Sequence, residues 1–309
     1  MAIKNPSIWL KLGWRLEALA YDLLVGAMRL LPVDVVSDIG AALLTTIGPL
    51  TSIQSVVNKN LDIAFPEKDA AWRKRIIRAQ WDNLGRTFAE FAIMDKITVA
   101  NGRIVVENGE RLEEIKRANK PVVFVSGHFS NWEVMPSVIM EYGVRCVMTY
   151  RAANNPYVDK RIREGRARYG VKLFAPKGGD GAKEMLLHMD EGESVALMND
   201  QKFNRGVSTP FFNSRVDTAP GPTRLAMRHN TVLQPMSVQR LHKARFRVLV
   251  HEPIAVENTG ARGADIDATV CKVSAFIEER VRARPEEWFW AHKRWPKEVY
   301  KGQPPATVT

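Results

Sequence analysis

The chain of 309 residues is 45% apolar and carries a formal net charge of +11. A chain of this length and composition can bury a full hydrophobic core, as one large domain or two small ones. Its two cysteines, Cys146 and Cys271, imply no disulfide framework and no cysteine-based metal site. The positive charge favours an acidic partner, which could be nucleic acid, an anionic membrane surface or an acidic carrier protein.

The N-terminal residues 14–31 predict an apolar helix with one narrow polar stripe. Arg15, Asp22 and Arg29 recur every seven residues, and Lys11 lies on the same side. The broad leucine-rich face that remains could lie in the headgroup boundary of a membrane or dock on the body of the protein, and the sequence leaves both alternatives open. Such a segment lacks the features of a cleaved signal peptide.

The following uncharged stretch, residues 39–58, is long enough to span a membrane. Gly48-Pro49 and several polar side chains make a spanning helix the less favoured interpretation. We therefore expect residues 1–60 to form a membrane-associating region that packs on a single α/β domain of residues 61–309.

From residue 70 onward, short apolar runs alternate with segments of helical periodicity. Such an alternation predicts an α/β fold with a central, mostly parallel or mixed sheet flanked by helices. The predicted helices cover residues 70–92, 110–118, 156–169, 182–189, 223–228 and 266–283, and the predicted strands cover residues 104–106, 121–126, 144–150, 171–174, 195–198, 232–239 and 245–250.

Residues 121–133 carry the clearest chemistry. The run Pro121-Val122-Val123-Phe124-Val125 predicts a buried strand, and the loop after it presents His128 and then Glu133. Histidine at the carboxyl end of a strand can act as a general base, and a nearby carboxylate can orient its ring. The alternative is structural, because Ser130-x-x-Glu133 also fits a helix capping box.

A second polar group, Asn199-Asp200-Gln201-Lys202, follows the predicted strand 195–198. Its position at the end of a strand predicts a second lip of the same crevice, although Asn and Asp also favour ordinary turns. Near the C-terminus, residues 288–296 mix tryptophans with cations. This segment could anchor at a membrane interface, cover the site or simply pack as a terminal segment.

Between Arg145 and Lys183 the chain has ten basic residues and three acidic ones. This excess predicts a local positive field that could hold phosphate groups or an acidic protein, or a solvated helix face. Nucleic acid is a poor candidate because no helix-turn-helix, zinc-finger or aromatic RNA-binding motif accompanies the charge.

Four sequence blocks together resemble the lipid A late acyltransferases, the lauroyl and myristoyl transferases of lipopolysaccharide synthesis within the lysophospholipid and glycerol-phosphate acyltransferase superfamily. They occur in the family's order. The blocks are Gly127-His128-Phe129-Ser130-Asn131-Trp132-Glu133, Tyr150-Arg151-x-x-Asn154-Asn155-Pro156, Asn199-Asp200-Gln201 with Pro210-Phe211-Phe212, and Trp290-x-His292-x-Arg294.

The resemblance implies an enzyme associated with the cytoplasmic face of the bacterial inner membrane, and the N-terminal residues favour peripheral over spanning attachment. It would transfer a fatty acyl chain from acyl carrier protein to a hydroxyl of a glycolipid, a lipid A precursor. We expect no cofactor and no metal, since no residue pattern in the sequence requires one. By position, His128 would be the general base and Glu133 its partner. The remaining positions would contact the substrates or shape the substrate pocket: Asn131, Arg151, Asn154, Asn155, Asp200 and Gln201.

Other functions stay open at this stage. Within acyltransferases, the acceptor could be a phospholipid or an amino-lipid. A serine hydrolase is disfavoured, because Ser130 lacks the Gly-x-Ser-x-Gly elbow. A non-catalytic membrane- or lipid-binding protein would need the basic and aromatic surfaces but no paired acid and base in a crevice.

Overall fold

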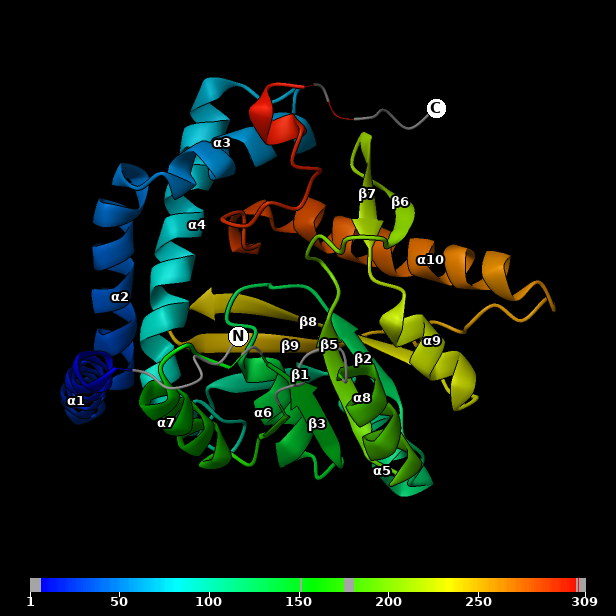
Figure 1. The fold of residues 1–309 in the computed structure, drawn as a ribbon, viewed down its shortest axis with the longest axis horizontal. Helices are drawn as coiled ribbons and strands as arrows, with labels where there is room; N and C mark the ends of the chain where they lie inside the picture. Colours follow the sequence, from blue (N-terminus) through cyan, green and yellow to red (C-terminus); the bar gives the residue numbers. More distant parts are fainter. Residues whose placement is uncertain (1–6, 151, 175–180, 304, 306–309) are drawn as a thin grey trace.

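In the computed structural model, residues 7–150, 152–174, 181–303 and 305 are described, and they form a seven-stranded sheet, a two-stranded hairpin and surrounding helices (Figure 1). The helices are α1 (Ile8–Leu30), α2 (Val33–Ile47), α3 (Ile53–Ala64), α4 (Ala70–Glu90), α5 (Glu110–Ala118), α6 (Val134–Glu141), α7 (Pro156–Ala167), α8 (Gly181–Asp190), α9 (Gly221–Arg228) and α10 (Arg262–Ala283). The strands are β1 (Ile104–Glu107), β2 (Val123–Ser126), β3 (Cys146–Thr149), β4 (Lys172–Phe174), β5 (Ser194–Met198), β6 (Val207–Phe211), β7 (Ser214–Thr218), β8 (Leu233–His242) and β9 (Arg245–Val250). Short 3-10 helices cover Gly48–Leu50 (η1), Phe91–Lys96 (η2), Pro285–Glu287 (η3) and Val299–Lys301 (η4).

The large sheet has the strand order β1-β9-β8-β2-β5-β3-β4, and its neighbours run parallel except for the β8–β9 pair. The central strand β2 is buried along its whole length between β8 and β5. Helices cover the faces of a parallel sheet, which explains why this strand is a continuous apolar run. The predicted α/β class is confirmed, as is each helix and strand predicted from residue 70 onward.

Helices α2 and α4 lie side by side at one end of the sheet (Figure 1). Their backbones meet at two glycines, since a Cβ added to Gly40 would lie 2.2 Å from the carbonyl oxygen of Gly85. Polar contacts join the same helices, because the Ser37 hydroxyl donates to Glu90 at 2.7 Å. By length and composition Val33–Leu50 could cross a membrane, with 28% of it buried inside the protein. One side of this segment thus packs against α4.

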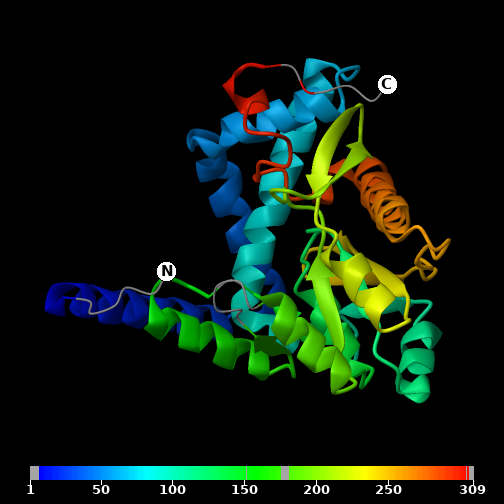
Figure 2. The same cartoon turned by 45° about the vertical axis from the view of Figure 1, so that its right-hand side comes forward.

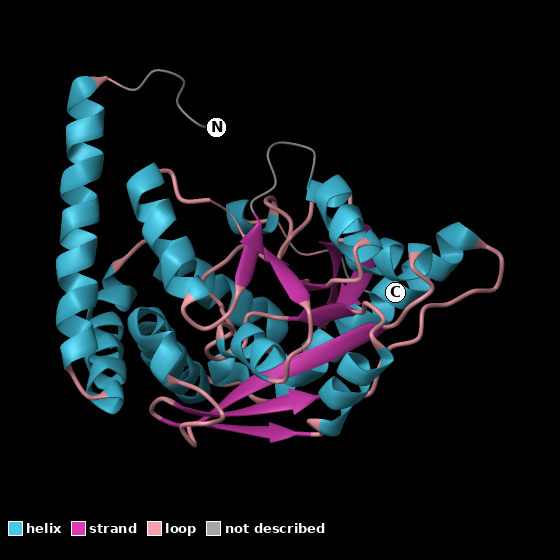
Figure 3. Cartoon of the chain, turned by 90° about the horizontal axis from the view of Figure 1, so that it is seen from below, coloured by secondary structure: helices cyan, strands magenta, loops and turns pink. Residues whose placement is uncertain are grey.

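Helix α1 runs beside α7 and projects from the rest of the molecule (Figure 2), and Figure 3 shows it standing at one edge. Two residues of its polar stripe pair with the protein: Asp22 with Arg161 at 2.6 Å, and Arg29 with Asp95 at 2.7 Å. Its leucines point outward, and Leu23 is 67% exposed. This polarity is the reverse of that of a helix on the surface of a soluble protein.

The hairpin of β6 and β7 packs on α10, where Ser274 donates a hydrogen bond to the carbonyl of Pro210 at 2.9 Å. This hairpin is not among the elements predicted from the sequence. The residues after α10 turn back over the core, and the tryptophans at 288, 290 and 295 are fully buried. Asn60 donates to the carbonyl groups of Trp290 and His292, both at 2.8 Å. Of the alternatives for residues 288–296, the structure therefore supports packing and rules out a membrane anchor.

Candidate active site

His128 and Asp200 meet above the ends of two adjacent strands. β2 and β5 are parallel neighbours, with Ser126 opposite Met198, so the loops that follow them emerge at the same edge. Nδ1 of His128 lies 2.7 Å from Oδ1 of Asp200. The backbone N–H of His128 also donates to Oδ2 of this carboxylate, again at 2.7 Å. The two loops predicted to form one crevice are therefore joined through these two residues.

The electrostatics of the pair fix its protonation. Burial alone would raise the pKa of Asp200, but the charge and hydrogen bonds of His128 outweigh burial and hold that pKa well below its ordinary value. Burial lowers the pKa of His128, yet the attraction of Asp200 and of Glu133 leaves it raised overall. An ionised Asp200 fixes the proton of the neutral imidazole on Nδ1, so the lone pair is on Nε2. The other ring nitrogen is thus available as a base.

Glu133 makes a different contact from the one predicted. Its carboxylate accepts a bidentate pair from Arg166, with Nε at 2.7 Å from Oε2. The hydroxyl of Tyr169 also donates to Oε2, at 3.1 Å. The predicted pairing of His128 with Glu133 is therefore corrected: Asp200 makes the hydrogen bond to the imidazole, and Glu133 reaches the ring only as a nearby charge. Arg166 and Tyr169 were missed, because only the three-dimensional fold brings α7 to this loop.

The capping-box alternative is also wrong. Helix α6 begins at Val134 with Glu133 as its N-cap residue, and the Glu133 carboxylate is occupied by Arg166. Ser130 has a left-handed backbone with φ of 49°, which is uncommon for a residue other than glycine. Its N–H donates to the carbonyl of Glu287 at 2.7 Å, and its carbonyl accepts from Thr87 at 3.1 Å. Two distant segments thus hold a strained loop in place.

Asn131 was predicted to contact substrate, and the structure gives it a different role. The side chain is completely buried. Its amide donates to Glu90 at 2.8 Å, and its carbonyl oxygen accepts from the N–H of Glu133 at 3.2 Å. Glu90 is in turn paired with the buried Arg240 at 2.5 Å. Asn131 therefore anchors the His128 loop to a buried ion pair, and this correction follows from its burial.

The other predicted substrate contacts have four different outcomes. Asn155 is buried as the N-cap of α7 and donates to the carbonyl of Trp14 at 2.9 Å, so its predicted substrate role is corrected to a structural one. Asp200 belongs beside His128 rather than in a separate acceptor pocket. Asn154 and Gln201 are exposed and stay predictions. Arg151 lies outside the described residues.

Aromatic rings lie close to the His128 imidazole. The Trp132 ring meets the imidazole edge-on at 5.0 Å, and the Phe289 ring lies 6.1 Å away. Phe88 and Phe91 continue this cluster from Trp132, at 6.4 and 6.0 Å. Phe88 is itself half exposed. The base therefore sits beside an apolar surface that reaches the outside of the protein.

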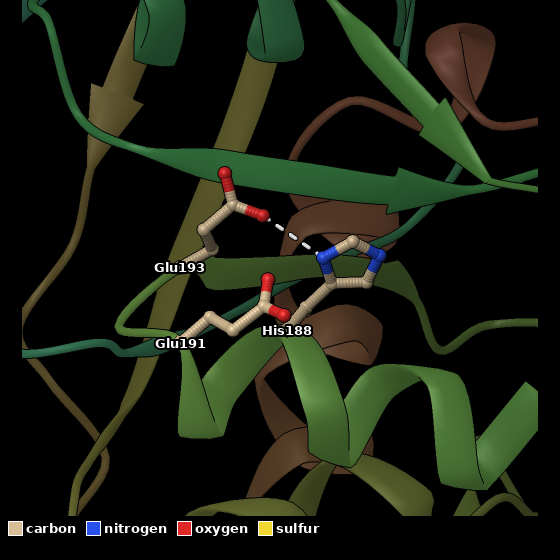
Figure 4. Close-up of side chains that lie close together, drawn as sticks. All are labelled: His188, Glu191 and Glu193. Atoms are coloured by element: carbon tan, nitrogen blue, oxygen red, sulfur yellow. Dashed lines mark hydrogen bonds and ion pairs between the residues drawn. The ribbon is translucent and has the colours of Figure 1, made fainter.

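A second cluster, His188, Glu191 and Glu193, has its ligand atoms within 4.8 Å of one another (Figure 4). A positive charge already lies there, because Lys172 Nζ is 3.2 Å from Glu193. Nδ1 of His188 is 2.9 Å from the same carboxylate. Glu193 immediately precedes β5, whereas Asp200 follows that strand. The cluster is thus at the opposite edge of the sheet from His128, and ion pairing accounts for it.

Comparison with known proteins gives one consistent result. Residues 14–297 match the family model described as "Bacterial lipid A biosynthesis acyltransferase". Three relatives from Escherichia coli (strain K12) are similar over most of their length. The chain is 23% identical to lipid A biosynthesis palmitoleoyltransferase over 248 residues, which are 78% of each chain. It is 22% identical to the lauroyltransferase over 249 residues, again 78% of each chain, and 26% identical to the myristoyltransferase over 244 residues, 76% of this chain and 72% of that one.

Proposed function

Because this chain belongs to the bacterial lipid A biosynthesis acyltransferase family and is therefore an acyltransferase, we propose that it transfers a fatty acyl chain from acyl carrier protein to a hydroxyl group of a lipid A precursor. His128 is the general base in this proposal, and Asp200 orients it. The observation that carries it is the 2.7 Å contact between His128 Nδ1 and Asp200 Oδ1 at the ends of two parallel strands.

The proposed reaction is direct acyl transfer. Nε2 of His128 takes the proton of the acceptor hydroxyl while its oxygen attacks the carbonyl carbon of the thioester. The C–O bond forms, the C–S bond breaks, and the imidazolium returns the proton to the departing thiolate. Asp200 stays ionised throughout and stabilises the imidazolium. General-base catalysis typically contributes about 10²–10⁴-fold to the rate.

In this proposal Glu133 contributes in two ways. As a nearby negative charge, it adds to the attraction that raises the pKa of His128. Through Arg166 and Tyr169, it also ties α7 to the loop that carries the base. α7 belongs to the basic segment between Arg145 and Lys183, so this contact places positive charge next to the site. We assign that charge to acidic groups, either phosphates of the acceptor or the acidic carrier protein.

The apolar surface beside His128 suits a long acyl chain. Trp132, Phe289 and the half-exposed Phe88 offer a continuous series of ring contacts from the base toward the outside. Each CH₂ group of an acyl chain that is buried against such a surface contributes about 0.8 kcal/mol to binding. The relatives are named for lauroyl, myristoyl and palmitoleoyl transfer. The assay of this enzyme should therefore compare acyl donors of these chain lengths.

The orientation of α1 supports attachment to a membrane surface. Asp22 and Arg29 on its polar stripe are paired with the protein, while Trp9 is 79% and Leu23 67% exposed. An exposed apolar face of this kind is covered when the helix lies in the headgroup boundary. We propose peripheral attachment of the enzyme at the cytoplasmic face of the bacterial inner membrane, with the net charge of +11 favouring its anionic lipids.

The test is acyl transfer from radiolabelled acyl carrier protein to a lipid A precursor, with wild type and His128→Ala purified side by side. We expect transfer by the wild type and a loss of about 10²-fold or more in the variant. If only phospholipid or amino-lipid acceptors are acylated, the glycolipid assignment fails and the base assignment stands. If a folded wild type acylates none of these acceptors, the proposed reaction fails.

A further inference from the structure

The segment Glu287–Arg294 lies between the two loops that carry His128 and Asp200. It pairs with the first loop through the backbone: Phe289 N–H donates to the carbonyl of His128 at 3.1 Å, and the carbonyl of Glu287 accepts from Ser130 at 2.7 Å. Phe129 and Trp288 form an antiparallel β-bridge at this point. The C-terminal part of the chain thus adds a short strand-like partner to the His128 loop.

Side chains of the same segment hold the second loop. The indole Nε1–H of Trp288 donates to Oδ2 of Asp200 at 2.8 Å. Nε2 of His292 lies 3.2 Å from the backbone oxygen of Asp200. Arg294 donates to the carbonyl of Gln201 at 3.1 Å. Three side chains within seven positions therefore contact two consecutive residues at the end of β5.

These contacts are rigid because their donors are enclosed. Trp288 and Arg294 are each only 1% exposed. The Arg294 guanidinium also donates to the carbonyl of Asp217 at 2.9 Å and to the hydroxyl of Thr218 at 2.7 Å. Burial lowers the pKa of Arg294 to about 10, so it stays charged at neutral pH. A buried cation with several acceptors fixes the geometry of its neighbours, since moving it would leave a charge without partners.

We propose that the segment Glu287–Arg294 is a positioning element for the base, in which Trp288 locks the Asp200 carboxylate against His128. The contact geometry carries this inference by itself, and its catalytic consequence rests on the proposed function. With Trp288 in place, Oδ2 of Asp200 is occupied by two donors, and Oδ1 is left facing the imidazole. Rotation of the carboxylate away from His128 would break all three contacts.

The indole also tunes the proton affinity of the base. A donor on Oδ2 withdraws negative charge from the carboxylate, so Trp288→Phe leaves more of that charge for the imidazole and raises the pKa of His128. Among the described residues, the other charged or titratable groups that act on the pair are Glu133, His292 and Arg294. Burial lowers the pKa of His292 to about 4, which keeps it neutral over the range where His128 titrates.

The chain supplies a matched control for Trp288. Trp290 is equally buried, meets Trp288 edge-on with the ring centroids 4.6 Å apart, and also donates through Nε1, but to the carbonyl of Pro285 at 2.6 Å. Trp288→Phe and Trp290→Phe therefore remove the same atoms from the same cluster, and only Trp288→Phe removes a donor from Asp200.

The experiment measures the His128 ring titration by NMR in wild type and both variants, with His128→Ala used to assign the signal, and kcat and KM in parallel. For Trp288→Phe we expect a higher His128 pKa and about tenfold lower kcat with little change in KM, the effect of one lost hydrogen bond to a charged group. For Trp290→Phe we expect the wild-type titration. An unchanged His128 pKa in Trp288→Phe, or equal shifts in both variants, would overturn the proposal.

A second measurement uses only the wild-type protein, so it does not depend on whether Trp288→Phe folds. In the wild type, the indole N–H signal of Trp288 should shift with pH at the midpoint of the His128 titration. The indole N–H signal of Trp290 should not shift at this midpoint. If neither indole follows the His128 titration, the positioning role fails. Neither NMR measurement depends on which acceptor the enzyme uses. The positioning role is therefore tested independently of the acyl-transfer assay, even if that assay fails.

Discussion

Oδ1 of Asp200 accepts from Nδ1 of His128 at 2.7 Å, although 72 residues separate the two in the chain. Glu133, only five residues from the histidine, is bonded to Arg166 instead. The two carboxylates near the base therefore have separable tasks. One sets the tautomer and stabilises the imidazolium, and the other connects the site to α7.

This division predicts different effects of two isosteric substitutions. Asp200→Asn removes the charge that faces Nδ1, so we expect kcat/KM to fall by about 10²-fold or more, together with a lower His128 pKa. Glu133→Gln weakens the contact with Arg166, and we expect a smaller shift of the His128 pKa. Activity assays and NMR titration of His128 on both variants check this. A larger pKa shift in Glu133→Gln than in Asp200→Asn would restore the pairing first predicted from the sequence.

The pH dependence of the wild-type enzyme follows from the same pair. The base acts as neutral imidazole, so kcat/KM should rise with pH through the pKa of His128 and level off above it. Asp200 and Glu133 raise that pKa above its ordinary value of 6.5, which places the rising limb at higher pH than for an isolated histidine. In Asp200→Asn the limb should move to lower pH, because burial of the ring then dominates. Rate profiles that coincide for the two proteins would exclude His128 as the titrating base.

The sequence could predict where the site lies but not which carboxylate serves the base. The apolar run before His128 and the one before Asp200 both indicate strand ends, and ligands of open α/β sheets gather there. That β2 and β5 are direct neighbours, with β3 beyond them, depends on how the whole chain packs. Without the strand order, Glu133 was the obvious partner by proximity in sequence.

The hairpin of β6 and β7 was missed for a local reason. Its two-residue turn is Phe212-Asn213, with Phe212 at a φ of 54°, where Asn-Gly would have been the recognisable signal. Pro210 within β6 further weakens the strand pattern. The polar stripe of α1, by contrast, was visible in the sequence, but its direction depends on Arg161 and Asp95 far along the chain.

The crossing of α2 and α4 predicts a strong response to a single methyl group. A Cβ at Gly85 would lie 2.1 Å from the carbonyl oxygen of Gly40, and backbone cannot rotate away. We expect Gly85→Ala to lower the free energy of unfolding by about 1–3 kcal/mol. Gly26→Ala in α1 is the control, because open space surrounds that position, and we expect it to be neutral or stabilising by up to about 1 kcal/mol. Denaturant titrations that show equal effects would refute the close crossing.

His251 predicts a loss of stability in acid. Burial, with the charges of Arg280 and Arg111, lowers its pKa to about 4, against an ordinary value of 6.5. Between these values the unfolded chain binds a proton that the folded chain does not, so the stabilising effect is complete above pH 6.5 and declines as the pH falls toward 4. His251→Gln keeps a polar group near Ser237, which contacts the imidazole at 2.8 Å. Its unfolding free energy should depend less steeply on pH over this range, and an identical slope in both proteins would contradict the assignment.

The exposed leucines of α1 predict how the enzyme binds membranes. Leu19 and Leu23 are 54% and 67% exposed, on a helix whose Asp22 and Arg29 pair with the protein. Replacing both by serine removes apolar area that would enter the headgroup boundary, and we expect binding to vesicles that contain anionic lipid to weaken by about tenfold or more. Vesicle sedimentation at constant salt measures this directly.

The matched control for the α1 variant is a leucine pair on other elements. Leu187 on α8 and Leu241 on β8 are exposed to similar extents, at 52% and 48%. Leu187→Ser with Leu241→Ser removes comparable apolar area and net hydrophobicity but leaves α1 intact. We expect wild-type vesicle binding from this control, because only area in contact with lipid contributes. Equal losses in both double variants would show that general surface hydrophobicity drives binding, and α1 would then have no special part in attachment.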